Sequence, residues 1–362
     1  MTTTAPQRAA VTGAHLVGSV NLPSAEEVLG TVADRLGTAI SHIPDGEVGE
    51  RYYWLQFQTR RFDRTPGLVR LGDTPYLIRG EFDQRPFALD GSEPAEALAF
   101  PDLGYAQAAI DSYAVFARLQ AEGRIAAGTR FQVSLPTPAA VVGVFIAPQD
   151  RAAVEPAYTR ALFAEVDRIT AAVPHDALQI QWDTAVEFAW LERAVLGGAV
   201  LAPWWDDVLE GVLTRLAADA AQVPADVPVG FHLCYGDVEE AHFVQPADAG
   251  VLAQVVRGLL ERSPHPIAYV HLPVPIERDD AAYFAPLADL ALPEGTDLYL
   301  GLVHHEDGVE GALRRIDAAS TAVPRFGVAT ECGFGRGPAE RTVPLLDLHR
   351  AVLEAAAGPA DA

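Results

Sequence analysis

The chain has no lysine, one methionine and two cysteines among its 362 residues. The lack of lysine excludes Schiff-base chemistry and a lysine general base, so arginine carries every permanent positive charge on a side chain. Two cysteines cannot form a disulfide framework for a chain of this length, and a reducing compartment would keep both as thiols. The thiols are therefore available to a metal ion, although composition alone favours two buried, inert cysteines.

Positive charge is scarce, because 26 basic residues face 49 acidic ones and the net charge is -23 at pH 7. Binding to nucleic acid or to an anionic membrane requires a basic patch, so neither is an expected partner. The chain also lacks an apolar run of about 18 residues that would predict a membrane helix, and its first residues do not resemble a secretion signal. We therefore expect a cytoplasmic protein that acts on small molecules.

Hydrophobic residues make up 49% of the chain, which is enough for one large core. Short apolar segments alternate with longer amphipathic ones, the pattern of strands and helices in a parallel sheet. The predicted strands are residues 15–18, 38–43, 131–135, 178–182, 227–234, 267–271, 298–303 and 326–330. The predicted helices are residues 25–36, 105–121, 151–172, 204–221, 247–262, 280–290, 309–319 and 339–356.

Eight such units in this length predict an α/β fold, a (β/α)8 TIM barrel, whose active site lies at the carboxyl ends of the strands. We expect a single domain over residues 1–362, with a flexible N-terminus at residues 1–10. Between the second and third strands, residues 51–100 mix aromatic, Arg, Pro and Gly residues without a clear period. This insertion is expected to form a lid or a loop that covers the edge of the barrel.

Residues that can bind a metal follow two of the predicted strands. His232 and Cys234 lie two positions apart at the end of the fifth strand, so their side chains face the same side. Cys332 follows the eighth strand. One imidazole and two thiolates suit zinc, and three protein ligands leave one coordination position for chemistry. The spacing therefore predicts a catalytic zinc site, with buried structural residues as the alternative.

Five segments at predicted strand ends carry a family resemblance: Leu16-Val17-Gly18-Ser19, Asp45-Gly46-Glu47, Gln181-Trp182-Asp183, His232-Leu233-Cys234-Tyr235 and Cys332-Gly333-Phe334-Gly335-Arg336. In this order they resemble the catalytic barrel of cobalamin-independent methionine synthase and its short single-barrel relatives, in the uroporphyrinogen decarboxylase and methionine synthase-like superfamily. The resemblance covers most of the chain. It implies a barrel enzyme that uses zinc to transfer a methyl group to a thiol.

The resemblance also implies a role for the matching residues. The implied substrate-binding residues are Gly18, Ser19, Glu47, Asp183 and Arg336. Gly18 and Ser19 would hold the carboxylate of an amino acid, whereas Glu47 and Asp183 would surround its ammonium group. Arg336 would bind a substrate carboxylate or pair with an acid at the barrel rim. Asp45 and Glu47 could instead cap the turn at Gly46, and Asp183 could cap the next helix.

The implied metal ligands are His232, Cys234, His271 and Cys332. His271 stands near the place where the family has a glutamate, and Glu277, a substrate atom or water compete with it for the fourth position. The predicted catalytic residues are Asp183, His304 and His305. Either of the last two histidines can titrate near neutral pH and could protonate a leaving group.

The leading prediction is a zinc-dependent methyl or alkyl transferase of the methionine synthase type, in which a small thiol amino acid such as homocysteine attacks an alkyl donor as a zinc thiolate. Two alternatives stay open: a zinc hydrolase or lyase that uses a metal-bound water, and a metal-free decarboxylase-like or binding barrel. The donor is also open, between a methylfolate, a methylated corrinoid on a carrier protein and a specialised metabolite.

Overall fold

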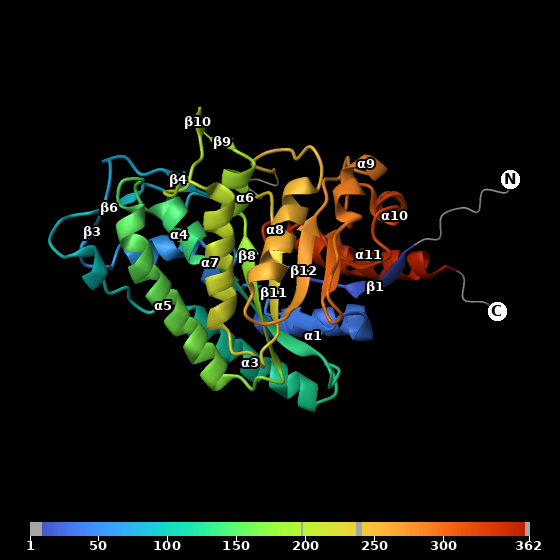
Figure 1. Ribbon diagram of the computed structural model, residues 1–362. Coiled ribbons are helices and arrows are strands. Elements are labelled where there is room, and N and C mark those ends of the chain that lie inside the picture. Colours follow the sequence, from blue (N-terminus) through green and yellow to red (C-terminus); the bar gives the residue numbers. More distant parts are fainter. Residues whose placement is uncertain (1–8, 197, 237–240, 359–362) are drawn as a thin grey trace.

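The computed structural model describes residues 9–196, 198–236 and 241–358, which form an α/β barrel (Figure 1). Eight parallel strands make one sheet in the order β1, β14, β13, β12, β11, β8, β7, β2. The strands are β1 (Ala10–Ala14), β2 (His42–Pro44), β7 (Arg130–Pro136), β8 (Leu178–Thr184), β11 (Val229–Leu233), β12 (Ile267–Pro273), β13 (Asp297–Gly301) and β14 (Arg325–Val328). An isolated parallel bridge between Ala14 and Ile40 closes the circle. The predicted (β/α)8 fold is confirmed.

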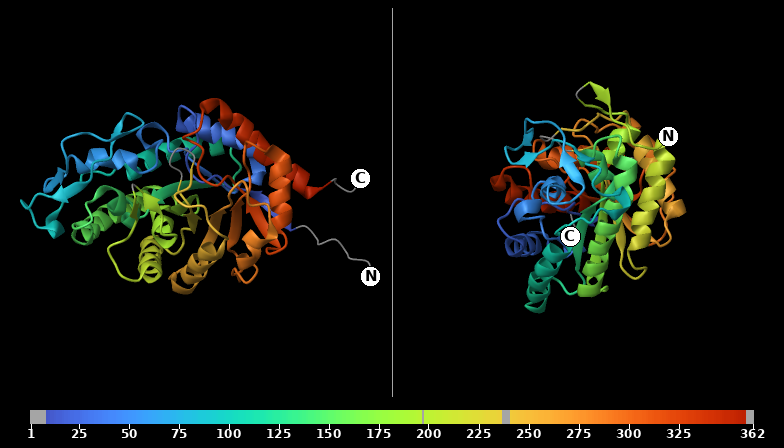
Figure 2. Two further views of the ribbon diagram at one scale, coloured as in Figure 1. Left: turned by 90° about the horizontal axis from the view of Figure 1, so that it is seen from above. Right: turned by 90° about the vertical axis from the view of Figure 1, so that its left-hand side faces the viewer.

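Helices connect successive strands and form the outer layer of the barrel (Figure 2). They are α1 (Ala25–Leu36), α3 (Tyr105–Ala121), α5 (Arg151–Ala172), α7 (Val208–Gln222), α8 (Gly250–Arg262), α9 (Ala281–Phe284), α10 (Gly308–Ala319) and α11 (Ala339–Ala357). Several begin at a capping side chain: Ser24 accepts a hydrogen bond from the Glu27 N–H at the start of α1. No helix in the described part of the chain combines the length and the apolar character that crossing a membrane requires.

Helices α1, α3 and α5 have the bounds that their periodicity predicts, but the first two strands do not. β1 ends at Ala14 instead of spanning residues 15–18, and β2 begins only at His42. Beyond Ala14 the backbone is satisfied by side chains, since the Val17 carbonyl accepts hydrogen bonds from Gln132 Nε2 at 2.9 Å and Ser134 Oγ at 3.0 Å. Most of the N-terminus predicted as flexible, residues 1–8, lies outside the described residues, and Ala10 already belongs to β1.

The insertion between β2 and β7 consists of short turns, helix α2 (Thr59–Phe62) and two antiparallel hairpins. The hairpins pair β3 (Leu68–Arg70) with β6 (Phe87–Leu89) and β4 (Leu77–Ile78) with β5 (Phe82–Asp83). Phe62 anchors the insertion, because its ring lies 5.7 Å from that of Phe145 and 5.5 Å from that of Tyr158. The insertion therefore packs beside α5, where Figure 1 shows β3 and β6.

Two short helices that the periodicity did not predict follow β7 and β8. They are α4 (Pro138–Phe145) and α6 (Val186–Leu191). Helix α4 begins at Thr137, whose hydroxyl accepts a hydrogen bond from the Ala140 N–H at 3.0 Å. It has no polar face, so its sequence shows no helical period. After α6, the hairpin of β9 (Val195–Leu196) and β10 (Ala199–Val200) projects at the top of Figure 1.

The barrel interior contains histidines and tyrosines where aliphatic layers are usual. His15 and His42 share a hydrogen bond of 2.8 Å, and the Tyr269 hydroxyl donates to Gln181 Oε1 at 2.7 Å. Burial lowers the pKa of His42 to about 3, so this ring is neutral at physiological pH. The ring of His271 on β12 lies 5.4 Å from that of His15, so these buried rings pack directly below the carboxyl end of β12.

Candidate metal centre and substrate pocket

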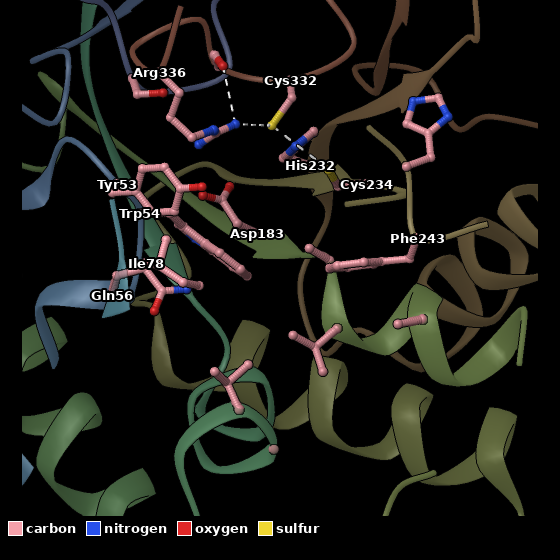
Figure 3. Close-up of a pocket in the computed structure, with 18 of the residues that line it drawn as sticks. Tyr53, Trp54, Gln56, Ile78, Asp183, His232, Cys234, Phe243, Cys332 and Arg336 are labelled. Atoms are coloured by element: carbon pink, nitrogen blue, oxygen red, sulfur yellow. Dashed lines mark hydrogen bonds between the residues drawn. The ribbon is translucent and has the colours of Figure 1, made fainter. Parts of the chain in front are cut away.

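His232, Cys234 and Cys332 come together at the carboxyl ends of β11 and β14 (Figure 3). Their ligand atoms all lie within 4.8 Å of one another, and the two sulfurs are 3.8 Å apart. A tetrahedral zinc ion with zinc–sulfur bonds of about 2.3 Å holds two thiolates roughly 3.8 Å apart, whereas a disulfide bond is about 2.0 Å long. The sulfur spacing and the donor set of one imidazole and two thiolates both fit a zinc ion.

Hydrogen bonds behind His232 decide which of its ring nitrogens is free. His271, its neighbour on β12, places Nε2 3.0 Å from the Thr330 carbonyl oxygen and Nδ1 2.7 Å from Nδ1 of His232. Burial and the neighbouring His232 lower the pKa of His271 well below its usual range, so this ring is neutral. A carbonyl can only accept, so Nε2 of His271 donates to Thr330 and Nδ1 of His271 accepts from His232.

His232 therefore carries its proton on Nδ1 and has a lone pair on Nε2. That buried atom has no hydrogen-bond partner among the described residues. Metal-binding histidines are commonly oriented in this way, by a hydrogen bond from the ring nitrogen that does not touch the metal. His271 thus lies behind His232, with both ring nitrogens engaged, and does not join the group of three side chains that could hold a metal ion.

Arg336 lies against the sulfur of Cys332. Its Nη2 is 3.1 Å from that sulfur and 3.3 Å from the Gly333 carbonyl oxygen. The hydrogen bond from Cys234 and the charge of Arg336 hold the pKa of Cys332 well below its usual range. Both effects favour the thiolate, which is the form that binds metal ions.

The loop that follows Cys332 packs directly on Ser19. The Phe334 N–H donates to the Ser19 carbonyl oxygen at 3.0 Å, and the Gly335 N–H donates to the Ser19 hydroxyl at 3.3 Å. A Cβ at Gly333 would lie 2.3 Å from the Ser19 hydroxyl oxygen, so only glycine allows this approach. The contact brings the segment with Gly18 and the segment with Cys332 to the same pocket wall.

Two buried carboxyl groups, those of Glu47 and Asp183, line the pocket beside the candidate metal ligands. Burial raises the pKa of Glu47 to about 7. Burial and the nearby charge of Glu47 raise the pKa of Asp183. A cation between the two would stabilise both carboxylates, as the ammonium group of an amino acid could. Asp183 lies within β8, and the residue at the N-cap of α6 is Ala185, so Asp183 does not cap that helix.

Asp45 has a structural role that differs from that of Glu47. Its carboxylate accepts hydrogen bonds from the Glu47 N–H at 3.0 Å, Arg51 Nη2 at 2.6 Å and Ser112 Oγ at 2.8 Å. Asp45 therefore stabilises the turn through Gly46, as the turn interpretation expects. Glu47 adopts a left-handed φ of 51°, which is strained for a residue other than glycine. Its Oε1 lies 3.2 Å from the position of a Cβ on Gly18.

The predicted general acids His304 and His305 are not among the described residues that line the pocket. His304 is buried, with Nε2 3.0 Å from the Val274 carbonyl oxygen, and burial lowers its pKa to about 4. His305 is exposed and pairs with Glu306 at 3.0 Å. Glu277, the competing metal ligand, is exposed.

A histidine that was not singled out from the sequence, His242, does line the pocket. Its Nε2 lies 3.2 Å from Glu331 Oε1.

The pocket has a volume of about 590 Å³ and two chemically different ends (Figure 3). The metal end consists of Gly18, Ser19, Glu47, Asp183, His232, Cys234, Cys332 and Arg336. The other end, which we call the apolar chamber, is lined by Trp54, Ile78, Val144, Val186, Ala189, Trp190, Leu201 and Phe243. Figure 3 shows Trp54 and Ile78 below Arg336 and Cys332.

The apolar chamber was missed from the sequence because irregular segments build it. Trp54 and Ile78 belong to the insertion, and Val144 and Trp190 lie on the two short helices α4 and α6. The available signal was the density of aromatic residues directly after the second predicted strand, at residues 52–54. Aromatic residues next to a predicted strand end indicate a binding surface, but they do not reveal which other segments complete it.

The fold resembles solved structures at low sequence identity. A B12-independent methionine synthase from Shewanella sp. W3-18-1, in complex with selenomethionine, matches with a TM-score of 0.60 and 14% identity over 97% of each chain. A Listeria monocytogenes protein described as a vitamin B12-independent methionine synthase matches with a TM-score of 0.57 and 15% identity over 96% of this chain and 99% of its own. No protein-family model and no curated protein sequence matches the chain. These likenesses establish the barrel fold.

Proposed function

We propose that the protein is a zinc-dependent methyl or alkyl transferase whose acceptor is the thiol of a small amino acid such as homocysteine. The observation that carries the proposal is the buried Nε2 of His232, which has no hydrogen-bond partner among the described residues and lies beside the sulfurs of Cys234 and Cys332. Its setting supports an amino-acid acceptor, because Glu47 and Asp183 line the same pocket. The Shewanella structure, which has this fold, is a complex with the amino acid selenomethionine.

His232, Cys234 and Cys332 would hold the zinc ion. When bound, zinc supplies the positive charge that lowers the pKa of a substrate thiol, so that its sulfur can act as a nucleophile at neutral pH. Glu47 and Asp183 would hold the ammonium group, and Gly18 and Ser19 the carboxylate. The substrate sulfur would then face the candidate metal ligands. A small-molecule thiol and an alkyl donor are the two substrates that this proposal requires.

The transfer itself is a substitution at carbon. The acceptor thiol first loses its proton, and an electron pair of the sulfur then forms the new sulfur–carbon bond. The bond between that carbon and the donor breaks, and the leaving group keeps the bonding pair. Protonation of the leaving group requires a group that reaches the pocket. His304 and His305 do not line it, whereas His242 does.

Metal content and thiol binding test the proposal together. Purified protein should bind about one zinc ion per chain, and homocysteine added to cobalt-substituted protein should strengthen the sulfur-to-cobalt charge-transfer absorption. Cys234→Ser should abolish both signals. The matched control is His175→Asn, since His175 pairs with Asp226 at the surface.

The proposal would be contradicted if purified wild-type protein held no zinc and bound the thiol no better than Cys234→Ser does. Turnover of a single substrate without added thiol would indicate the hydrolase or lyase alternative instead.

A further inference from the structure

The pocket is much larger than an amino-acid acceptor requires. Its volume of about 590 Å³ lies in the range of roughly 300 to 1,000 Å³ that drug-sized ligands occupy. The acceptor would fill the metal end, beside Glu47 and Asp183. The apolar chamber is then left for the second substrate, and its walls describe the chemistry of that molecule.

We propose that the alkyl donor is a largely hydrophobic molecule with a flat, aromatic or similarly rigid body and one anionic group, bound with its body in the apolar chamber and the anionic group at Arg151. The role of this molecule as alkyl donor rests on the proposed transferase function, whereas its binding in the apolar chamber does not. Among the donors left open by the sequence, this chemistry favours a specialised metabolite over a multiply charged methylfolate or a corrinoid on a carrier protein.

The walls of the apolar chamber suit a flat hydrophobic body. Trp54 of the insertion and Phe243 of the loop after β11 both line it, and Trp190 of α6 contributes a third aromatic ring. Val144 and Leu201 add aliphatic surface. The ring of Trp190 is fixed by edge contacts with the rings of Trp204 and Trp205, at centroid distances of 5.7 and 5.2 Å. Rigid aromatic walls of this kind bind apolar ligands through dispersion and water exclusion.

Charge limits the donor to one anionic group at this end. Among the lining residues that the structure describes, Arg151 is the charged one at the apolar chamber, where Gln56 and Gln84 are neutral amides. Arg151 donates from Nε to the Ile146 carbonyl oxygen at 2.9 Å and from Nη1 to the Ala202 carbonyl oxygen at 3.4 Å. It forms no ion pair within the described residues, although the chain has 49 acidic residues.

A guanidinium without a carboxylate partner at the wall of an apolar pocket can pair with a carboxylate or sulfonate of a ligand. Burial lowers the pKa of Arg151, in agreement with the lack of a nearby anion. Further anionic groups on the donor would be desolvated against Trp54, Val144 and Leu201 without a partner, which is unfavourable. A donor with several carboxylates is therefore disfavoured.

Two fluorescent probes that differ by one sulfonate test this inference. They are 8-anilinonaphthalene-1-sulfonate and its uncharged analogue N-phenyl-1-naphthylamine, titrated into the full chain. Both should bind at about one site per chain, since each is small enough for one pocket. Arg151→Gln should weaken the sulfonate probe about tenfold and the neutral probe less than twofold, because only the sulfonate makes the charge-assisted contact.

Val144→Asp should weaken both probes by at least about tenfold, because it places a charge in the apolar wall. Val144→Phe, which fills the chamber without a charge, should also weaken the binding of both probes. This variant provides the test if Val144→Asp does not fold. Val200→Asp is the matched control, because Val200 is 50% exposed on the β9–β10 hairpin and does not line the pocket. Equal losses in Val200→Asp and Val144→Asp, or an unchanged preference for the sulfonate in Arg151→Gln, would overturn the inference.

The probes also separate this inference from the proposed function. Cys234→Ser should leave both probe affinities within about twofold, since the apolar chamber is built without that residue. Probe binding in a protein that holds no zinc would support the apolar chamber and contradict the transferase. A protein that holds zinc but binds neither probe would contradict the apolar chamber as a binding site and leave the transferase proposal standing.

Discussion

The two ends of the pocket are built in different ways. At the metal end, reactive side chains stand at the carboxyl ends of parallel strands of one sheet. Hydrogen bonds fix their orientation, as His271, itself bonded to the Thr330 carbonyl, does for His232. At the apolar chamber, the walls come from the insertion, two short helices and a loop, and they meet through aromatic packing. Strand ends place reactive atoms accurately, whereas connecting segments can change without disturbing them. We therefore expect a change in the apolar chamber to leave the metal end intact.

The largest expected effect separates the two ends directly. Cys332→Ser should lower zinc affinity at least a thousandfold, about 4 kcal/mol, because a thiolate ligand is lost. Val144→Phe should leave zinc affinity within about twofold, since Val144 belongs to the apolar chamber. Competition with a chelator of known affinity measures both. A comparable loss of zinc in the two variants would show that the ends are not independent.

A buried acid behind the apolar chamber makes that side sensitive to pH. Glu187 of α6 is 2% exposed, accepts a hydrogen bond from Thr137, and lies near Asp219 and Arg215, and burial raises its pKa from 4.5 to about 7. The folded state therefore binds more protons than the unfolded state between these values, so the free energy of unfolding falls as pH rises from about 4.5 to about 7.

Glu187→Gln should remove this loss. At pH 8 the variant should be more stable than wild type by up to about 3 kcal/mol, and near pH 4 the two should be similar. Urea unfolding at several pH values measures the difference. A variant that is less stable than wild type at pH 8 would show that the carboxylate has a favourable partner when charged.

Loss of the contact with the substrate ammonium group at the metal end is expected to have a smaller effect in free energy than the two changes above. Asp183→Asn should weaken homocysteine about thirtyfold, or about 2 kcal/mol, because a buried charged contact is lost. The same variant should bind 4-mercaptobutanoate, which lacks the amino group, about as well as wild type does. Isothermal titration of zinc-loaded protein gives both affinities. Equal weakening of the two thiols would contradict a contact with the ammonium group.

The smallest effect concerns orientation of a metal ligand. His271→Phe should lower zinc affinity about tenfold, since His232 loses the hydrogen bond that keeps its Nε2 unprotonated. His271→Gln can accept from His232 Nδ1 and should recover part of the loss. A loss in His271→Phe as large as that in Cys332→Ser would instead indicate that His271 binds the metal.

The helices and strands whose residues follow a local period could be predicted from the sequence, together with the site residues at their ends. Helix α5 matches its predicted bounds, and the strands that carry Asp183 and His232 were placed within two residues of their ends. β1 was misplaced, because residues 16–17 are apolar but have their backbone satisfied by Gln132 and Ser134. Helices α4 and α6 were missed, because buried helices show no amphipathic period.

The His-x-Cys spacing at His232 and Cys234 was informative in the sequence because side-chain alternation along a strand is a local property. The 3.8 Å approach of Cys332 to Cys234 joins residues 98 positions apart. The orientation of the His232 ring depends, through His271, on a carbonyl of Thr330 on another segment. The apolar chamber likewise joins the insertion to α4 and α6. Such features arise only when folding brings distant segments together and excludes water between them, so no local pattern encodes them.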